Sequence, residues 1–215
     1  FEQLELSDNY PGFQGMGYAA VVPVAELHRH EAAVRSEGFA SYHVFPRGQR
    51  AFYTSIVYLE PFDERNQRAF GYDMYAEPVR RAAMQRAAET GAPALSGRVV
   101  LKQESEGSAQ PGFLIYHAVN RSHRPGQCGE DLCNQLEGWV YAPFRMQDFM
   151  YRLMAGDHAQ DLHIRIYDGE SVRPESLLHS DSGPDGGGTL QTIRRLSLMG
   201  HVWTLQVGAA AGLQQ

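Results

Sequence analysis

The chain has 215 residues, of which 43% are hydrophobic and 20% are charged, a balance typical of a globular protein and unlike that of a disordered one. Its 25 acidic residues outnumber 19 Lys and Arg, giving a formal net charge of -6. Because no basic block is present, nucleic acid is not an expected partner. No apolar run reaches the ~18 residues of a membrane-spanning helix, and no signal peptide opens the chain.

The first group of elements mixes strands and helices. Strands are predicted at 17–22, 52–59, 99–103 and 113–119, and helices at 23–37, 66–70 and 77–90. Pro23 and Pro78 suit the first turns of two helices. Gly38 and Gly91 suit the ends of the same helices. The strand at 113–119 is apolar on both faces, which is typical of a strand inside a sheet.

A second, smaller group follows a long polar excursion from Asn120 to Leu136. Strands are predicted at 138–144, 162–167, 189–198 and 201–207, a helix at 146–154, and a tight hairpin at Met199 and Gly200. Antiparallel strands with helices beside them indicate an α+β fold rather than a doubly wound parallel sheet. We expect a lead-in at 1–16, a first lobe at 17–136 and a second lobe at 137–208.

The two cysteines, Cys128 and Cys133, lie in the polar excursion. A short disulfide between them would fit an oxidising compartment. Spacing does not fix the geometry that a disulfide needs, so two independent thiols remain the alternative. A structural zinc site is disfavoured because no second pair of ligands is nearby.

No catalytic, metal or cofactor site is predicted from motifs. The nine histidines include no His-Glu-x-x-His pattern, and His28 and His30 point to different faces of their helix. Gly12, Gly15 and Gly17 precede a strand rather than a helix, which excludes a dinucleotide loop. No nucleophile elbow is present. An uncharacterised hydrolase is therefore only the less favoured alternative to a protein without enzymatic activity.

An ordered set of motifs resembles the CHASE domain. It begins with Tyr10-Pro11-Gly12 and Gln14-Gly15, and continues through the segments at 58–61, 71–74, 112–116 and 138–145. No single motif is specific, but their order along 10–207 is that of the family. The family commonly has Pro-Val-Tyr after the central strand, whereas this chain has Ala118-Val119-Asn120.

The resemblance implies two stacked PAS-like lobes beside a long stalk helix that is mostly absent here. It implies a small-molecule pocket in the lobe farther from the membrane. Plant members bind cytokinins, which are adenine derivatives, whereas bacterial members lie in the periplasm and drive histidine kinases or diguanylate cyclases. We therefore expect the periplasmic sensor domain of a membrane-tethered receptor that dimerises through the stalk. The alternative is a protein-interaction module whose pocket is filled by Tyr116 and its neighbours.

The resemblance also suggests ligand-binding residues. Asp73 matches the aspartate that holds the adenine ring, although an ordinary cap or turn aspartate ahead of the helix at Pro78 is its alternative role. Leu95 matches an apolar wall of that pocket. Tyr116 replaces the small threonine of plant members, which would change the shape of the ligand.

Other side chains suit either a pocket or a core. Tyr58, Met74 and Phe113 are predicted to line the pocket, with plain core as the alternative for each. Arg80 and Arg81 lie on the helix after Asp73. An arginine suits a carboxylate ligand, but a solvated helix face is the expected place for both.

Overall fold

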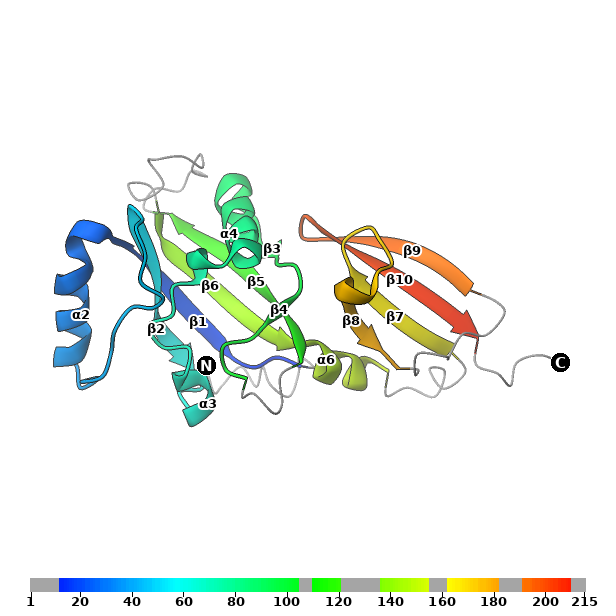
Figure 1. Cartoon of the computed structure of the whole chain (residues 1–215), viewed down its shortest axis with the longest axis horizontal. Coiled ribbons are helices and arrows are strands. Elements are labelled where there is room, and N and C mark those ends of the chain that lie inside the picture. Colours follow the sequence, from blue (N-terminus) through cyan, green and yellow to red (C-terminus); the bar gives the residue numbers. More distant parts are fainter. Residues whose placement is uncertain (1–11, 105–109, 121–135, 155–161, 182–190, 210–215) are drawn as a thin grey trace.

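The computed structural model describes residues 12–104, 110–120, 136–154, 162–181 and 191–209. Within them two antiparallel β-sheets lie beside each other along the long axis of the molecule (Figure 1). The predicted α+β fold with two lobes built on antiparallel sheets is confirmed. Most of the expected lead-in at 1–16, the candidate disulfide of Cys128 and Cys133, and most of the polar excursion lie outside the described residues.

The first sheet has the strand order β2-β1-β6-β5-β3, and β4 also pairs with β5. Its strands are β1 (Met16–Pro23), β2 (Phe52–Glu60), β3 (Ala94–Leu95), β4 (Val99–Val100), β5 (Pro111–Asn120) and β6 (Leu136–Arg145). The strand predicted at 99–103 stops at Val100, which pairs with Pro111. Pro111 has no backbone N–H, so the ladder cannot continue there.

Strand β6 corrects the predicted lobe boundary. The segment 138–144 was expected to open the second lobe, but it pairs with β1 and β5 inside the first sheet. Trp139 and Tyr141 are both buried, and a strand buried in this way needs partners on both edges. Gly138 permits the pairing with β1, because a Cβ there would lie 2.2 Å from the Ala19 carbonyl oxygen. The first sheet therefore extends to Arg145.

Helices cover both faces of the first sheet. The helical elements are η2 (Val24–Glu26), α2 (Leu27–Ser36), α3 (Glu64–Gln67), η3 (Met74–Ala76), α4 (Pro78–Thr90), α6 (Met146–Leu153) and η4 (Pro174–Ser176). The prediction at 77–90 is confirmed, with Glu77 capping the first turn and Gly91 ending the helix at φ 66°. The helix predicted at 66–70 begins earlier, because Asp63 accepts a hydrogen bond from Asn66 N.

The second sheet has the order β8-β7-β10-β9. Its strands are β7 (Leu162–Asp168), β8 (Leu177–Ser180), β9 (Gln191–Leu198) and β10 (His201–Ala209). The predicted hairpin is confirmed, with positive φ at Met199 (46°) and Gly200 (73°). Strand β8 was not predicted, because four residues, of which only Leu178 is buried, give too short a pattern to recognise.

Successive side chains of β5 point to opposite faces of the first sheet, and each face packs into a different core. Leu114 and Tyr116 point to the face covered by α4, whereas Phe113 points to a second core. That second core also contains Met150 of α6 and Trp203 of β10. The two sheets therefore share apolar packing and are not independent units. A third cluster lies between the first sheet and α2.

Candidate functional site

A small cavity lies between the first sheet, α4 and the segment after β4. It is lined by Ile56, Ala69, Tyr72, Met74, Arg80, Leu101, Lys102, Gln103, Leu114 and Tyr141. Its volume is about 10 Å³, which is room for about one water molecule. The lining is polar on one side, where Arg80 and the tyrosines lie, and apolar on the other.

Arg80 enters the cavity from the first turn of α4. Its residue surface is only 3% exposed, so the expectation of a solvated helix face is wrong. Arg80 begins the buried stripe that continues with Ala83, Met84 and Ala87, the spacing of a helix face that packs on a sheet. Its Nη2 donates to the Val100 carbonyl at 2.8 Å, and Nη1 lies 3.6 Å from Glu77 Oε2.

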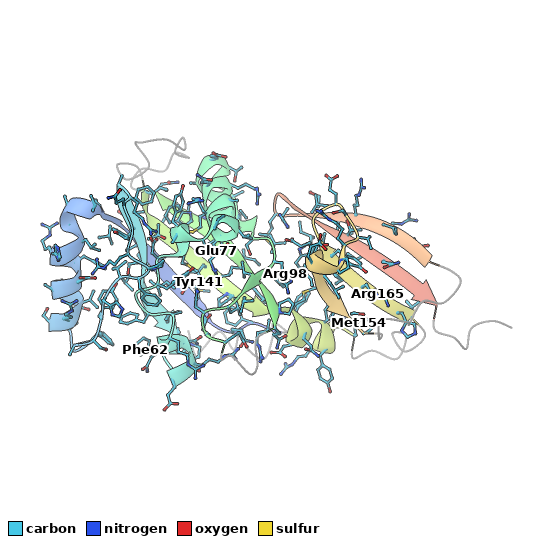
Figure 2. The ribbon with its side chains drawn as sticks, viewed as in Figure 1. Phe62, Glu77, Arg98, Tyr141, Met154 and Arg165 are labelled. Atoms are coloured by element: carbon cyan, nitrogen blue, oxygen red, sulfur yellow. The ribbon has the colours of Figure 1, made fainter. Side chains whose placement is uncertain are left out.

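Tyr116 and Tyr141 face each other across β5 and β6, with ring centroids 6.1 Å apart. Both are buried, and neither hydroxyl has a hydrogen-bond partner among the described residues; the same holds for Arg80 Nε. Burial raises the pKa of both phenols, and the nearby Arg80 only partly opposes this. Both hydroxyls therefore stay protonated and can donate. Figure 2 shows Tyr141 inside the first lobe.

Two cations flank the ring of Tyr72 at the rim of the cavity. The Arg80 guanidinium carbon lies 5.5 Å from the ring centroid and Lys102 Nζ lies 5.0 Å from it, both within cation–π range. Among described carboxylates, none forms an ion pair with Lys102. The rim of the cavity is therefore positively charged.

Asp73 is fully buried near this cavity, and protein groups already occupy its carboxylate. Oδ1 accepts from Thr54 N and from Thr54 Oγ1, both at 2.9 Å, while Oδ2 pairs with Arg50. Glu77, not Asp73, caps α4, so the alternative role as a helix cap is wrong. Contact between Asp73 and a ligand remains a prediction.

The other five predicted ligand-binding residues fall into three places. Met74 lines the cavity and Tyr116 lies opposite Tyr141. Leu95 and Phe113 lie on the far side of the sheet, in the core shared with the second lobe. Tyr58 is 52% exposed. The structure thus brings Asp73, Met74 and Tyr116 to the α4 face of the first sheet but not the other three.

Sequence reasoning missed Tyr141 and Lys102 as site residues. Their positions depend on the pairing of β6 with β5 and on the turn after β4. Arg80 carried a usable signal, because it falls in register with Ala83 and Ala87 on the buried stripe of α4.

A hydrogen-bonded segment joins this site to the second sheet. Arg98 N donates to Asp168 Oδ2 at 2.9 Å, and Arg98 Nε donates to the Leu177 carbonyl at 3.1 Å. His201 Nε2 lies 2.6 Å from Asp168 Oδ1. Figure 2 shows Arg98 where the two sheets meet. Arg80 bonds to the Val100 carbonyl. The short stretch 98–100 therefore contacts both the cavity and the second sheet.

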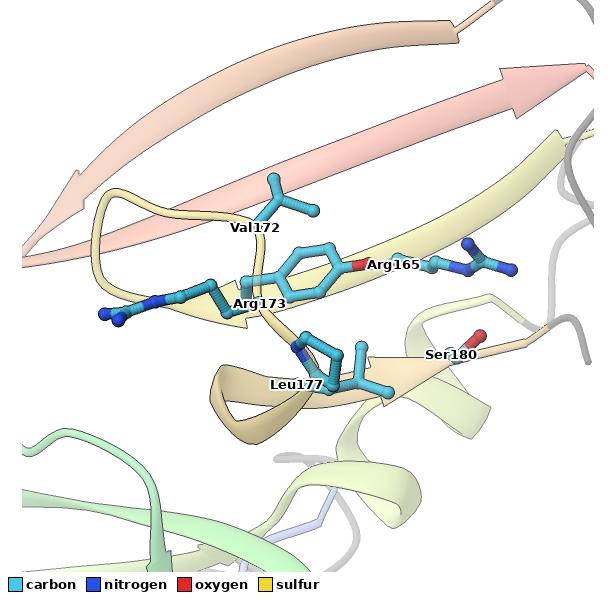
Figure 3. Close-up of a pocket in the computed structure, with 7 residues that line it drawn as sticks. Arg165, Val172, Arg173, Leu177 and Ser180 are labelled. Carbon is cyan, nitrogen blue, oxygen red and sulfur yellow. The ribbon is translucent and has the colours of Figure 1, made fainter. Parts of the chain in front are cut away.

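Two larger hollows are open recesses. One, of about 420 Å³, lies on the second sheet, where Arg165 and Arg173 point in opposite directions (Figure 3). The other, of about 380 Å³, is lined by aromatic residues that include Phe39, Phe62 and Phe70. Neither is lined by any described residue with a buried, unpartnered polar atom. The cavity at Arg80 is therefore the stronger candidate.

Replacing Gly17 by Ala is expected to disturb the cavity directly. A Cβ at this position would lie 2.4 Å from the hydroxyl oxygen of Tyr141. Forcing an extra methyl group into a packed core costs about 1–3 kcal/mol of unfolding free energy. Urea unfolding of Gly17→Ala measures this cost, and Gly17 does not have the positive φ that would add backbone strain to it. An unchanged free energy of unfolding for Gly17→Ala would show that Tyr141 is free to move.

The family profile of the CHASE domain matches residues 1–179. The chain belongs to the CHASE family. A CHASE domain is a sensor domain. The sensor role predicted from the resemblance is confirmed at this level.

Three solved structures are similar to this CHASE domain. An extracellular ligand-binding receptor from Desulfohalobium retbaense is 17% identical, with a TM-score of 0.44, over 85% of this chain and 36% of its own. Methyl-accepting chemotaxis protein X is 14% identical (TM-score 0.45), covering 95% and 77% of the two chains. The ligand-binding domain of the Pseudomonas aeruginosa amino acid chemoreceptor PctC, in complex with GABA, is 11% identical (TM-score 0.40), covering 91% and 74%.

No curated protein sequence matches this CHASE domain. Over the described ranges, none of its helices has the length and apolarity to cross a membrane. The same ranges hold no cluster of His, Cys, Asp and Glu suited to a metal ion.

Proposed function

We propose that this CHASE domain senses a small molecule bound at the Arg80 cavity and is the extracytoplasmic part of a membrane-tethered receptor. One observation carries the proposal. Arg80 Nε and the hydroxyls of Tyr116 and Tyr141 are buried on the same face of the first sheet and make no hydrogen bond within the part of the chain that the structure describes. Each such group costs about 1–3 kcal/mol when left unpaired. A ligand that pairs with them recovers this free energy.

The signal would leave the site through α4 and the segment from β3 to β4. Arg80 donates a hydrogen bond to the Val100 carbonyl, and Arg98 donates hydrogen bonds to Asp168 and Leu177 of the second sheet. A ligand that pulls Arg80 toward itself favours one arrangement of this segment over another. Such a ligand shifts the receptor only by its difference in affinity between the two arrangements.

The finer predictions of the sequence belong to the same proposal. The full receptor would carry a histidine kinase or diguanylate cyclase output, lie partly in the periplasm and dimerise through its stalk helix. An adenine-like ligand held by Asp73 stays a candidate, because Asp73 is buried beside Met74 of the cavity. Such a ligand would have to displace Arg50 or Thr54 from the carboxylate.

The second candidate is a protein-interaction module with no small ligand. The small volume of the cavity, about 10 Å³, favours this candidate, because Tyr116 and its neighbours fill most of the space. Against it stand the unpartnered polar atoms, since a cavity filled for packing alone is better lined by apolar side chains.

Thermal unfolding against a panel of compounds tests the proposal. The panel contains adenine derivatives, other purines, amino acids and short carboxylates, and a ligand of the folded state raises the midpoint by mass action. We expect at least one compound to raise the midpoint of the wild type and of Arg81→Met but not of Arg80→Met. Arg81 is the matched control, because it contacts Tyr75 outside the cavity. A panel that leaves the wild-type midpoint unchanged favours the interaction module.

A further inference from the structure

We infer that the cavity at Arg80 binds a compact carboxylate, of the size of formate or acetate. The inference rests on the proposed function and names the chemical class of its ligand. It begins from three buried atoms that have no hydrogen-bond partner among the described residues: Nε of Arg80 and the hydroxyl of Tyr141 at the cavity, and the hydroxyl of Tyr116, which is paired with Tyr141 on the neighbouring strand.

The hydrogen-bonding chemistry of these atoms selects an acceptor. The Nε of arginine donates and cannot accept. Burial keeps both phenols protonated, because it raises the pKa of Tyr116 and of Tyr141, so each hydroxyl has a proton to donate. A carboxylate has two oxygens with about four acceptor positions. It is therefore able to accept from more than one of these donors at once, first from Arg80 and Tyr141, which line the cavity.

The charges around the cavity favour a negative ligand. Its nearest carboxylates are already held by arginines, as Asp73 pairs with Arg50 and Glu77 lies 3.6 Å from Arg80. Glu77 also accepts from two backbone N–H groups of α4, which holds its carboxylate at the helix start. Lys102 adds a positive charge over Tyr72. A bound anion thus meets cations at close range and no free carboxylate of the described residues.

The size of the cavity sets the size of the ligand. A volume of about 10 Å³ holds little more than one water molecule. The outer wall is the stretch from Leu101 to Gln103, whose middle residue, Lys102, is exposed. Binding requires this wall to move outward, and a compact carboxylate needs the smallest displacement. A purine or an aromatic ligand needs a much larger displacement.

The test compares hydroxyl deletions with a matched control. Tyr116→Phe and Tyr141→Phe remove one oxygen each, and neither hydroxyl makes a hydrogen bond of good geometry with a described residue. Tyr167→Phe is the control, because its hydroxyl bonds to Gln206 in the second lobe. Binding is measured by titration calorimetry and by thermal shift with formate and acetate. Formamide and acetamide serve as neutral analogues, and sodium chloride matches the ionic strength.

We expect the carboxylates to bind and the amides and chloride to have no effect. Each Tyr→Phe change in the cavity should weaken binding about tenfold or more, the contribution of a hydrogen bond to a charged group. Tyr167→Phe should bind like the wild type. Without ligand, the two cavity variants should be as stable as the wild type or more stable, which shows that any loss of binding is not a loss of fold.

Two other outcomes would overturn the inference, and they are distinguishable. If a purine or another neutral compound binds and the cavity variants abolish that binding, the sensing site stands but the anionic ligand is wrong. If no compound binds and both Tyr→Phe variants only gain stability, the cavity holds water alone. In that case the proposed ligand site fails together with the inference.

Discussion

Asp73→Ala is expected to lower the free energy of unfolding by about 3–5 kcal/mol, the usual cost of removing one partner of a buried ion pair. The change leaves the N–H and hydroxyl of Thr54 without their acceptor and leaves Arg50 without its counter-charge. Arg50 keeps 26% of its side-chain surface exposed, so water solvates part of the abandoned charge and the lower half of the range is expected. Urea unfolding followed by circular dichroism measures the effect.

A double-mutant cycle separates the ion pair from the Thr54 bonds. Arg50→Met removes the charge partner but leaves Thr54 bonded to the carboxylate, and the combined variant gives the coupling free energy. The exposed pair Arg29 and Glu26, whose side chains are 77% and 51% exposed, is the control, with an expected contribution below about 1 kcal/mol. A loss within this same limit for Asp73→Ala would contradict a structural role and would leave its carboxylate free for a ligand.

Trp203→Ala should destabilise the contact between the two sheets by about 3–5 kcal/mol, the range for removing a buried large aromatic side chain. Trp203 is 5% exposed and lies edge-to-face on Phe113, with ring centroids 5.1 Å apart. The loss should fall on the second sheet first, because β5 keeps its partners in the first sheet. We expect the single unfolding transition of the wild type to separate into two.

The chain offers an internal reporter for this experiment. Trp139 and Trp203 are the only two tryptophans, so the fluorescence of Trp203→Ala comes from Trp139 in the first sheet alone. Circular dichroism reports both sheets. Coincident transitions by the two methods would show that the lobes remain one cooperative unit without this ring. Ile193→Ala, at a position 53% exposed on β9, should change stability by no more than about 0.5 kcal/mol.

The sequence predicted the ends of an element well where neighbouring residues determine them. The caps of α4 follow from Pro78 and Gly91, and the β9–β10 hairpin follows from Met199 and Gly200. Pairing between distant strands could not be predicted in the same way. Strand β6 lies after a long excursion, and its membership of the first sheet depends on the fit of Gly138 against Ala19.

The candidate site was predicted only in part, for a related reason. A family likeness indicated Asp73, Met74 and Tyr116, and all three lie on the α4 face of the first sheet. The likeness did not show that Asp73 is held by Thr54, nor that Leu95 points to the other face. The face of a short edge strand depends on its register against β5, which the sequence of Ala94 and Leu95 does not encode.

The most direct test of a ligand at Arg80 is a crystal structure of the chain grown in acetate. We expect density for a carboxylate within hydrogen-bond distance of Arg80 Nε and of the hydroxyls of Tyr116 and Tyr141, with the stretch from Leu101 to Gln103 displaced outward. A cavity that holds one water molecule, with these three atoms bonded to that water or to one another, would contradict this expectation.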